Sequence, residues 1–478
     1  MTEMTAATPG APEPVDVVIR DAWLITMDAE RRVFTDGAVA IRGRTIVAAG
    51  PARDVLPRFA PARTISARGA AVHPGFIECH NHATLQTVRG AIPDTISWDD
   101  VSGEFYVPYW NTVTDEEEHA GTLLACLEML RNGTTCFLES GTAFEPDVVA
   151  RAATALGIRA LVGDPFLWDV GGFHADAPEV RRAPATTERA MRLLGGQLWR
   201  NADPDALVRG HIAIVGMGSA SDALEIAASE AARAAGVVRN QHQSYCAADA
   251  ADDDARHGRH PLVHLAELGV LGPHAMFAHM NVLRDDEVAP IVESGMAISW
   301  NAPASMMWGV GGATGGRHAE LYRAGVTVGL GSDSSNWANS FDIGRAATTA
   351  ILAARDGRRD RTILTAEDGL TMATLGGARA TGLADRIGSI EPGKRADIVI
   401  RTDDLPEAHP PTDRIAAILY ATGSKSVHTV IVDGRVVIEA GRPTLVDAEA
   451  IYRGADAAAS AVLGRMGYRP PARWPRIA

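Results

Sequence analysis

The sequence predicts an α/β protein: a (β/α)8 TIM barrel joined to a small β-sandwich domain that is built from both ends of the chain. Strand and helix signals alternate through the middle of the 478 residues, at about 74–385. Short β-branched runs, split by Gly and Asp turns, fill 15–73 and again 386–442. Alternating strands and helices imply a parallel sheet, and eight strand signals between residues 71 and 332 suit a closed barrel.

The sandwich segments are recognisable by their short apolar runs. The first block contains VDVVIRDAWLITM and GAVAIRGRTIVAAG, and the second contains RADIVIR and SVHTVIVDGRVVIEAG. Residues 1–14 are small and Pro-containing with no apolar run, which indicates a disordered tail and not a signal peptide. Residues 443–478 are expected to form a C-terminal helix, within DAEAIYRGADAAASAVLGRM, followed by a Pro- and Arg-rich tail.

The barrel segment supplies eight expected strands with Ala- and Leu-rich helices between them. The runner-up fold, a doubly wound open sheet, should carry a Gly-rich phosphate loop after its first strand, and the sequence has none at that place. The expected strands cover 71–79, 134–139, 159–166, 210–217, 237–243, 275–280, 296–301 and 326–332.

Composition restricts the classes of partner. The net charge of −14, from 45 basic and 59 acidic residues, opposes a nucleic-acid partner, because phosphate binding needs a basic surface. No apolar run approaches the ~18 residues of a membrane span. The four cysteines show no C-x-x-C pairing, which favours a reducing, cytoplasmic location. A small-molecule substrate is the partner that remains.

Polar side chains lie where the expected barrel strands end. His80 and His82 are two residues apart on one strand, so both imidazoles face the same side. His242 and His279 end two later strands, and Asp333 follows the last one. A single buried His is usually structural. Five such groups at one barrel mouth, where barrel active sites form, predict a metal-dependent site.

Several motifs resemble the amidohydrolase superfamily, within it the branch of triazine chlorohydrolases and of S-adenosylhomocysteine and guanine deaminases. The similar stretches are PGFIECHNH, GTLLACLEMLRNGTTCFLESG, LGSDSSNWANSFD and MATLGGARATGLADRIGSIEPGKRADIVI, and the resemblance spans roughly 16–442. It implies metal ligands at His80, His82, His242 and Asp333, and a His279 that contacts the attacking water or the polarised group of the substrate. It also implies a homo-oligomer.

The number of metals can be predicted from the lack of a lysine in the barrel segment. Many superfamily members hold two metals bridged by a carbamylated barrel lysine, but the lysines here, Lys394 and Lys425, both lie outside 74–385. We therefore predict one metal, with Glu139 as the one candidate bridge to a second, although a structural role fits Glu139 better. Three His nitrogens and a carboxylate suit Zn²⁺, with Fe²⁺ or Co²⁺ also feasible.

The expected chemistry is hydrolysis by a metal-activated water. Asp333 would take the proton from this water and deliver it to the leaving group, while His279 would stabilise the developing negative charge. The resembling deaminases usually carry a Glu three residues after the fifth-strand His, and here that residue is Tyr245. Tyrosine, with a pKa of about 10, is a poor proton shuttle at neutral pH.

The sequence therefore favours cleavage of a C–N bond in an amide, urea or carbamate, as in the phenylurea and thiocarbamate (molinate) hydrolases that it also resembles. Two alternatives stay open. One is an aminohydrolase or dechlorinase acting on a heteroaromatic ring, and the other is a non-catalytic descendant that binds a ligand.

The substrate pocket is expected to be apolar. The seventh-strand motif of the resembling branch is altered, because Asn301 stands in place of a His and Met306 in place of an Asn. Aromatic residues crowd the segments that follow the strands, which suits an apolar or aromatic substrate. The predicted substrate-binding residues are Gln86, Tyr245, Asn301, Trp98, Trp300 and Met306.

Overall fold

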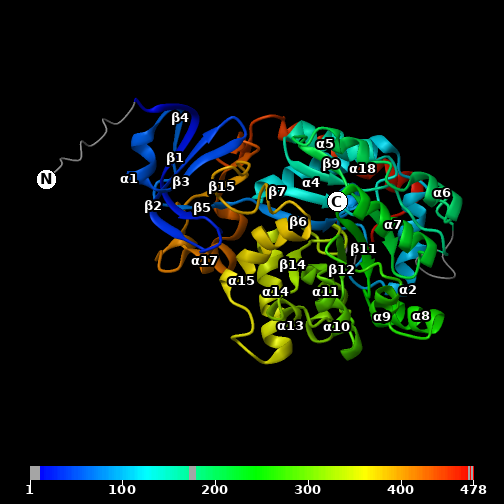
Figure 1. Cartoon of the computed structure of the whole chain (residues 1–478). Helices are drawn as coiled ribbons and strands as arrows, with labels where there is room; N and C mark the ends of the chain where they lie inside the picture. Colours follow the sequence, from blue (N-terminus) through cyan, green and yellow to red (C-terminus); the bar gives the residue numbers. More distant parts are fainter. Residues whose placement is uncertain (1–10, 172–178, 472–473, 475–476, 478) are drawn as a thin grey trace.

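The structure is a computed structural model that describes residues 11–171, 179–471, 474 and 477, the side chains of residues 98 and 99 excepted. It contains two large sheets (Figure 1). One sheet is assembled from both ends of the chain, and the other is a parallel barrel. The predicted fold class is therefore confirmed.

The first sheet follows the order β18-β17-β16-β15-β5-β1-β2-β3, with β4 paired to β1. Residues from its N-terminal and C-terminal strands share one hydrophobic cluster, which includes Ile19, Val39, Ile398 and Ile431. Strand β1 begins at Glu13, two residues earlier than expected, because Glu13 pairs with Phe59 of β4. The rest of the predicted tail lies largely outside the described residues. The strands are β1 (Glu13–Ile25), β2 (Val33–Arg42), β3 (Thr45–Pro51), β4 (Phe59–Ser66), β5 (Ala71–Pro74), β15 (Ile398–Arg401), β16 (Val427–Val432), β17 (Arg435–Glu439) and β18 (Arg442–Pro443).

The second sheet is parallel throughout and follows the order β10-β11-β12-β13-β14-β6-β7-β8-β9. Strands β9 and β10 are one stave interrupted at His211, since His211 N donates to Val162 O of β8 and Ile212 N donates to Val238 O beside β11. This stave closes the barrel. The strands are β6 (Phe76–Asn81), β7 (Thr134–Glu139), β8 (Arg159–Val162), β9 (Val208–Gly210), β10 (Ile212–Gly216), β11 (Arg239–Gln243), β12 (Ala275–His279), β13 (Ala297–Trp300) and β14 (Thr327–Leu330).

The strand expected at 71–79 is two strands, and Gly75 separates them. Gly75 N donates to Asp397 O of the first sheet, whereas Phe76 N donates to Gly133 O beside the barrel, both at 2.9 Å. A Cβ on Gly75 would lie 1.9 Å from Thr135 Oγ1, so only glycine allows the chain to pass this close to β7. Residues 71–74 therefore belong to the sheet, and the barrel begins at Phe76.

Helices cover the outside of the barrel. Helix α4 shows why they form where they do, because Thr114 and Glu117 make a capping box and acidic residues fill its first turn. Within the described part of the chain, no helix combines the length and the apolar character needed to cross a membrane. The helices are α1 (Ala52–Val55), α2 (Trp98–Val101), α3 (Val107–Trp110), α4 (Asp115–Arg131), α5 (Pro146–Leu156), α6 (Thr187–Leu193), α7 (Asp222–Ala235), α8 (Ala247–His257), α9 (Pro261–Glu267), α10 (Asp285–Ser294), α11 (Ala302–Trp308), α12 (Gly312–Gly315), α13 (His318–Arg323), α14 (Ile343–Arg358), α15 (Ala366–Thr371), α16 (Gly377–Ala380), α17 (Arg414–Ala417) and α18 (Ala448–Met466).

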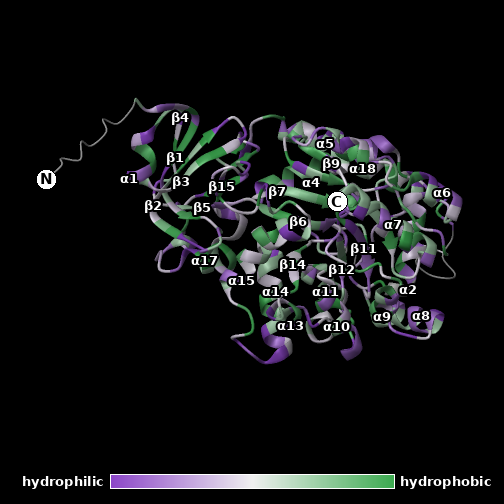
Figure 2. Ribbon diagram, viewed as in Figure 1, coloured by the Kyte–Doolittle hydropathy of each residue, from purple (hydrophilic) through white to green (hydrophobic). Residues whose placement is uncertain are grey.

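The first sheet and the barrel share a hydrophobic interface. One cluster joins β16 and β17 to α4, α5 and β7. Hydrophobic residues run through the strands of both sheets (Figure 2). A buried ion pair reinforces the junction. Arg159 of β8 donates from Nε and Nη2 to the two carboxylate oxygens of Asp397, at 2.9 and 3.0 Å. Such a bidentate contact fixes the orientation of the two side chains as well as their distance, so the barrel is held in one position against the sheet.

Candidate active site

The carboxyl ends of four barrel strands bring the predicted polar residues together. His80 lies in β6 and His82 just after it, His242 lies in β11, and Asp333 follows β14. His279 ends β12, where it pairs with Gln243 beside His242. The backbone of Asp333 is tied to β6, because Asp333 N donates to His80 O at 3.0 Å. All five side chains are buried at the barrel mouth.

The hydrogen bonds of two imidazoles determine which nitrogen is free. His242 Nδ1 lies 2.7 Å from the carbonyl oxygen of Val215, which can only accept, so Nδ1 carries the proton. His80 Nδ1 lies 2.9 Å from Ser140 Oγ, whose own proton goes to the carbonyl of Asn81. Ser140 must therefore accept from His80 Nδ1. In both rings Nε2 is left with its lone pair, and none of the described residues makes a hydrogen bond to the buried Nε2 of His80.

A carboxylate orients the third imidazole through a hydroxyl group. Thr142 Oγ1 donates to Glu139 Oε1 at 3.2 Å and accepts from His82 Nδ1 at 2.7 Å. The Nε2 atom of His82 therefore also carries a lone pair. Glu139 in addition accepts from the backbone nitrogens of Gly141 and Thr142, at 3.0 and 2.9 Å. It thus anchors the loop after β7 and points its oxygens at that loop.

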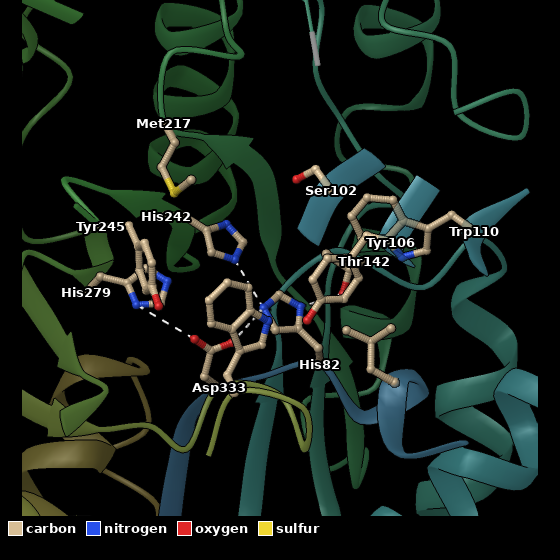
Figure 3. A pocket seen from close by; sticks show the side chains of 12 residues that line it. His82, Ser102, Tyr106, Trp110, Thr142, Met217, His242, Tyr245, His279 and Asp333 are labelled. Atoms are coloured by element: carbon tan, nitrogen blue, oxygen red, sulfur yellow. Dashed lines mark hydrogen bonds and ion pairs between the residues drawn. The ribbon is translucent and has the colours of Figure 1, made fainter. Parts of the chain in front are cut away.

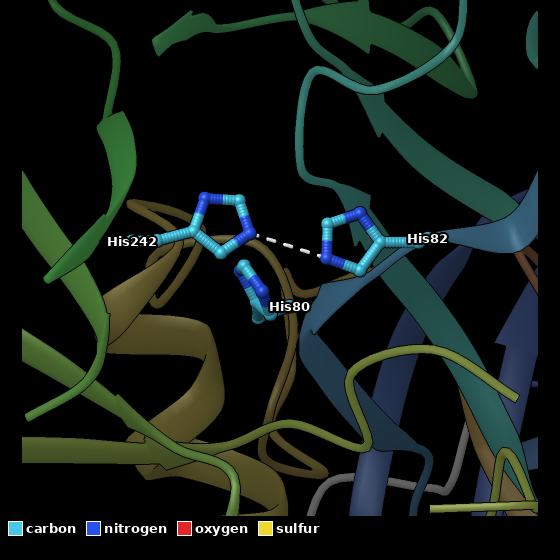
Figure 4. A group of neighbouring side chains, drawn as sticks. All are labelled: His80, His82 and His242. Atoms are coloured by element: carbon cyan, nitrogen blue, oxygen red, sulfur yellow. Dashed lines mark hydrogen bonds between the residues drawn. The ribbon is translucent and has the colours of Figure 1, made fainter. Parts of the chain in front are cut away.

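The lone pairs of these side chains face one another. His82 Nε2 lies 3.2 Å from His242 Nε2 and 3.3 Å from Asp333 Oδ1, and the three imidazoles converge (Figure 4). Without a cation this arrangement is repulsive. Ligands placed ~2.0–2.1 Å from a tetrahedral zinc ion lie about 3.3–3.4 Å apart. The three imidazoles are therefore spaced to hold a divalent metal, with Asp333 beside His82, and Asp333 also lies in a second group of possible ligands with His80 and His279.

The backbone at Asp333 is held in a strained conformation by its neighbours. Asp333 has a φ of +67°, which is uncommon for a residue with a side chain. The buried carboxyl of Glu78 accepts from Ser332 N at 3.0 Å and from His80 N at 3.1 Å, and so ties the two segments together. Burial raises the pKa of Glu78 to about 8, against the effect of these hydrogen bonds.

His279 contacts Asp333 and a neighbouring amide. Its Nδ1 lies 3.9 Å from Asp333 Oδ2 and 3.5 Å from Asn301 Nδ2, and Asn301 Oδ1 accepts from Ser299 Oγ at 3.0 Å. Burial, followed by the charges of His82 and His318, lowers the pKa of His279 to about 3. His279 is therefore neutral and can donate from Nε2 while its Nδ1 accepts from Asn301.

A cavity of about 60 Å³ adjoins these residues. Figure 3 shows Asp333 between His279 and His82, with Tyr106, Trp110 and Tyr245 around them. The aromatic rings contact one another, since Tyr106 stacks on Trp337 at 6.0 Å and Tyr245 meets Trp337 edge to face at 5.2 Å. Asp333 is the one carboxylate among the described lining residues. The lining consists of His82, Leu85, Ser102, Tyr106, Trp110, Thr142, Met217, His242, Tyr245, His279, Asp333 and Trp337.

The predicted substrate-binding residues are scattered. Tyr245 lines the cavity, and Asn301 reaches it only through His279. Gln86 does not line it, because its Nε2 donates to Glu128 Oε2 at 2.6 Å. Trp300 instead stacks on His318, with ring centroids 4.6 Å apart.

Two further substrate predictions have different outcomes. Met306 is 52% exposed on α11 and is absent from the lining, because the helix turns this side chain outward. Met306 therefore lies outside the cavity lining in this structure, and its contact with substrate stays a prediction. Trp98 begins α2, but its side chain lies outside what the structure describes.

Sequence reasoning missed several lining residues. Met217 has a φ of +53° and lies between two glycines with positive φ, immediately after β10. This Gly-Met-Gly pattern at a strand end is a signal that could have identified it. Thr142 follows β7 in a similar position. Trp110 carries no comparable signal, because it lies in a helix 28 residues beyond His82 in sequence.

The hydroxyl of Thr142 offers a direct test of how His82 is oriented. Thr142→Val keeps the shape of the side chain but removes the acceptor for His82 Nδ1–H. We expect metal affinity to fall about 10–100-fold, the usual cost of losing a group that orients a metal ligand. Competition with a chromophoric chelator measures the change. Thr142→Ser restores the hydroxyl and should restore affinity; equal affinity in Thr142→Val and the natural protein would contradict the orienting role.

Comparisons with known proteins agree with this geometry. The sequence profile described as the amidohydrolase family matches residues 71–437. The chain belongs to the amidohydrolase family. A 5-methylthioadenosine/S-adenosylhomocysteine deaminase of Syntrophobacter fumaroxidans is 32% identical over 426 residues, which cover 89% of this amidohydrolase and 93% of the relative.

Solved structures show the same fold. An adenosine deaminase from Xanthomonas campestris with bound zinc is 29% identical, with a TM-score of 0.87, over 95% of this chain and 100% of that one. An atrazine chlorohydrolase from Arthrobacter aurescens, complexed with zinc, is 25% identical with a TM-score of 0.81, over 93% and 100% of the two chains. The amidohydrolase is thus a metal-dependent hydrolase that acts on carbon–nitrogen bonds other than peptide bonds, as predicted, and its cofactor is a divalent metal.

Proposed function

We propose that this amidohydrolase cleaves the C–N bond of an amide, urea or carbamate in a small, largely apolar or aromatic molecule. The observation that carries the proposal is the absence, among the described lining residues, of any carboxylic acid besides Asp333. Tyr245 stands where the resembling deaminases carry a proton-delivering Glu. Burial, followed by the charge of Asp333, raises its pKa well above 10. A neutral phenol can donate a hydrogen bond but does not deliver protons readily at pH 7.

One divalent metal, with zinc as the best match to the donor set, would be held by His80, His82, His242 and Asp333. Fe²⁺ and Co²⁺ suit the same donors. When bound, the metal supplies the Lewis acidity that makes water nucleophilic near neutral pH. Glu139 is the one candidate bridge to a second metal. Its carboxylate oxygens already accept hydrogen bonds from Gly141 and Thr142. This supports a mononuclear site.

The remaining steps use the side chains of the cavity. Asp333 accepts the proton of the attacking water and returns it to the leaving nitrogen. His279, neutral and oriented by Asn301, donates a hydrogen bond to the carbonyl oxygen as that oxygen gains negative charge. The aromatic wall of Tyr106, Trp110 and Trp337 excludes water and offers ring faces for an aromatic substrate.

A second candidate, deamination of a heteroaromatic ring, is favoured by the names of the relatives. The deaminase relative and the adenosine deaminase structure match this chain over nearly its whole length. In that reaction Tyr245 would hydrogen-bond a ring nitrogen in place of protonating it. Ring dechlorination is a variant of the same candidate, as in the chlorohydrolase.

A substrate panel separates the two candidates. We expect the metal-loaded protein to release amine from anilides, phenylureas or aryl carbamates. The activity should be lost on chelation and restored by added Zn²⁺, Fe²⁺ or Co²⁺. Ammonia release from 5-methylthioadenosine or S-adenosylhomocysteine, with no turnover of open-chain carbonyl compounds, would instead establish the second candidate. Samples stripped of metal serve as the control for each substrate. The cytoplasmic location and the homo-oligomer remain predictions.

A further inference from the structure

A second group of metal-ligating side chains lies apart from the active site. Asp222 begins α7, His257 ends α8 and His264 lies in α9. Their candidate ligand atoms all lie within 4.8 Å of one another. His264 Nε2 is 2.8 Å from Asp222 Oδ1, and the two imidazole rings stack with centroids 3.9 Å apart. Three separate helices thus direct ligand-type atoms to one point.

A small cavity lies beside these side chains. The cluster borders a cavity of about 20 Å³, which is also lined by Glu225 and Asp253. About 10–15 Å³ is enough to hold a single water molecule. Glu225 is already paired with the buried Arg239, but Asp253 adds negative charge. The neighbouring cation, Arg256, donates to the carbonyl of Gly218.

The two imidazole rings lie face to face beside the carboxylate of Asp222. A neutral imidazole is the form that ligates a metal. Two imidazoles and a carboxylate, open to water on one side, are a donor set that zinc accepts.

We propose that Asp222, His257 and His264 form a second, peripheral site for a divalent metal of the zinc type. The Asp222 side chain is 51% exposed, so solvent reaches the cluster from its side. The bound ion joins the ends of α7, α8 and α9. Its role is to stabilise this corner of the barrel.

The site is connected to the active site through two contacts. Gln243, directly after the ligand His242, donates from Nε2 to Asp253 Oδ2 at 3.1 Å. Gly218 lines the small cavity, and its neighbour Met217 lines the active-site cavity. An ion at the peripheral site therefore also restrains the segment after β10 that borders the substrate.

Zinc titration of the metal-loaded protein tests the proposal. We expect the natural protein to bind one equivalent more than His257→Ala, measured by competition with a chromophoric chelator and by elemental analysis. Added zinc should raise the unfolding temperature of the natural protein in a concentration-dependent manner, and this increment should be lost in His257→Ala. Asp222→Asn, a substitution on the surface, should weaken the same equivalent by at least about tenfold.

The matched control is His260→Ala. His260 lies in the same region and pairs with Asp254 but does not belong to the cluster. This variant should keep the full stoichiometry. Equal stoichiometry in the natural protein and His257→Ala, or an equal loss in His260→Ala, would overturn the site. If His257→Ala does not fold, the zinc stoichiometry of Asp222→Asn decides the test, because the Asp222 side chain is half exposed and its loss should not prevent folding.

Discussion

Replacing Asp333 by Asn is expected to lower kcat by about 10²–10⁴-fold, the usual contribution of a positioned general base and acid. Asparagine has nearly the same shape and keeps an oxygen toward the metal, but it cannot accept the proton of the attacking water. Because three histidines remain, most of the metal should stay bound. Steady-state kinetics on the best substrate of the panel, together with elemental analysis, measure both quantities.

The control for this variant is Asp36→Asn, which removes an exposed carboxylate from β2 in the first sheet. It changes the net charge equally and should leave kcat and KM unchanged. Full activity in metal-loaded Asp333→Asn would show that another group handles the proton. Loss of metal with the loss of activity would instead mean that Asp333 acts chiefly as a ligand.

His242→Ala should remove the metal and with it all measurable turnover. His242 Nε2 faces His82 Nε2 at 3.2 Å, so its loss opens one side of the ligand set. Loss of a group that merely orients a ligand costs about 10–100-fold in affinity, and loss of the ligand itself should cost more than about 100-fold. Elemental analysis of the purified variant and activity at rising zinc concentration measure this loss.

His428→Ala is the comparison for His242→Ala, since His428 is an exposed residue of β16 far from the barrel mouth. It should retain metal and rate. A cooperative thermal unfolding transition must first show that His242→Ala is folded. A folded His242→Ala that purifies with a full equivalent of active-site metal would remove His242 from the ligand set.

Much of the fold could be predicted from local pattern. The alternation of strands and helices and the β-branched blocks at both ends are properties of neighbouring residues, and the eight expected strands correspond to the staves of the barrel. The expected strand boundary was wrong where contact with a distant segment decides where a strand ends. The strand at 71–79 divides at Gly75 because β7 packs against that glycine, and Thr135 is sixty residues away in sequence.

In the candidate site, too, some residues could be placed from local spacing and others depend on distant contacts. His80 and His82 could be paired from their spacing, because alternate residues of a strand share a face. Gln86 lies outside the cavity lining, because its side chain donates to Glu128, which belongs to another helix. Met306 is exposed on α11, and hydrophobicity alone does not indicate toward which side a short helix directs a side chain.

By itself the sequence determined the barrel, the sheet shared by both chain ends and the five polar residues at the strand ends, because each depends on patterns within a few residues. Tertiary structure alone decided the rest. The proton positions on His80, His82 and His242 are set by Ser140 and Thr142, in the loop after β7, and by Val215 of β10. The aromatic wall and the peripheral cluster of Asp222, His257 and His264 likewise exist only once separate helices and loops meet, since contact in space does not follow from distance along the chain.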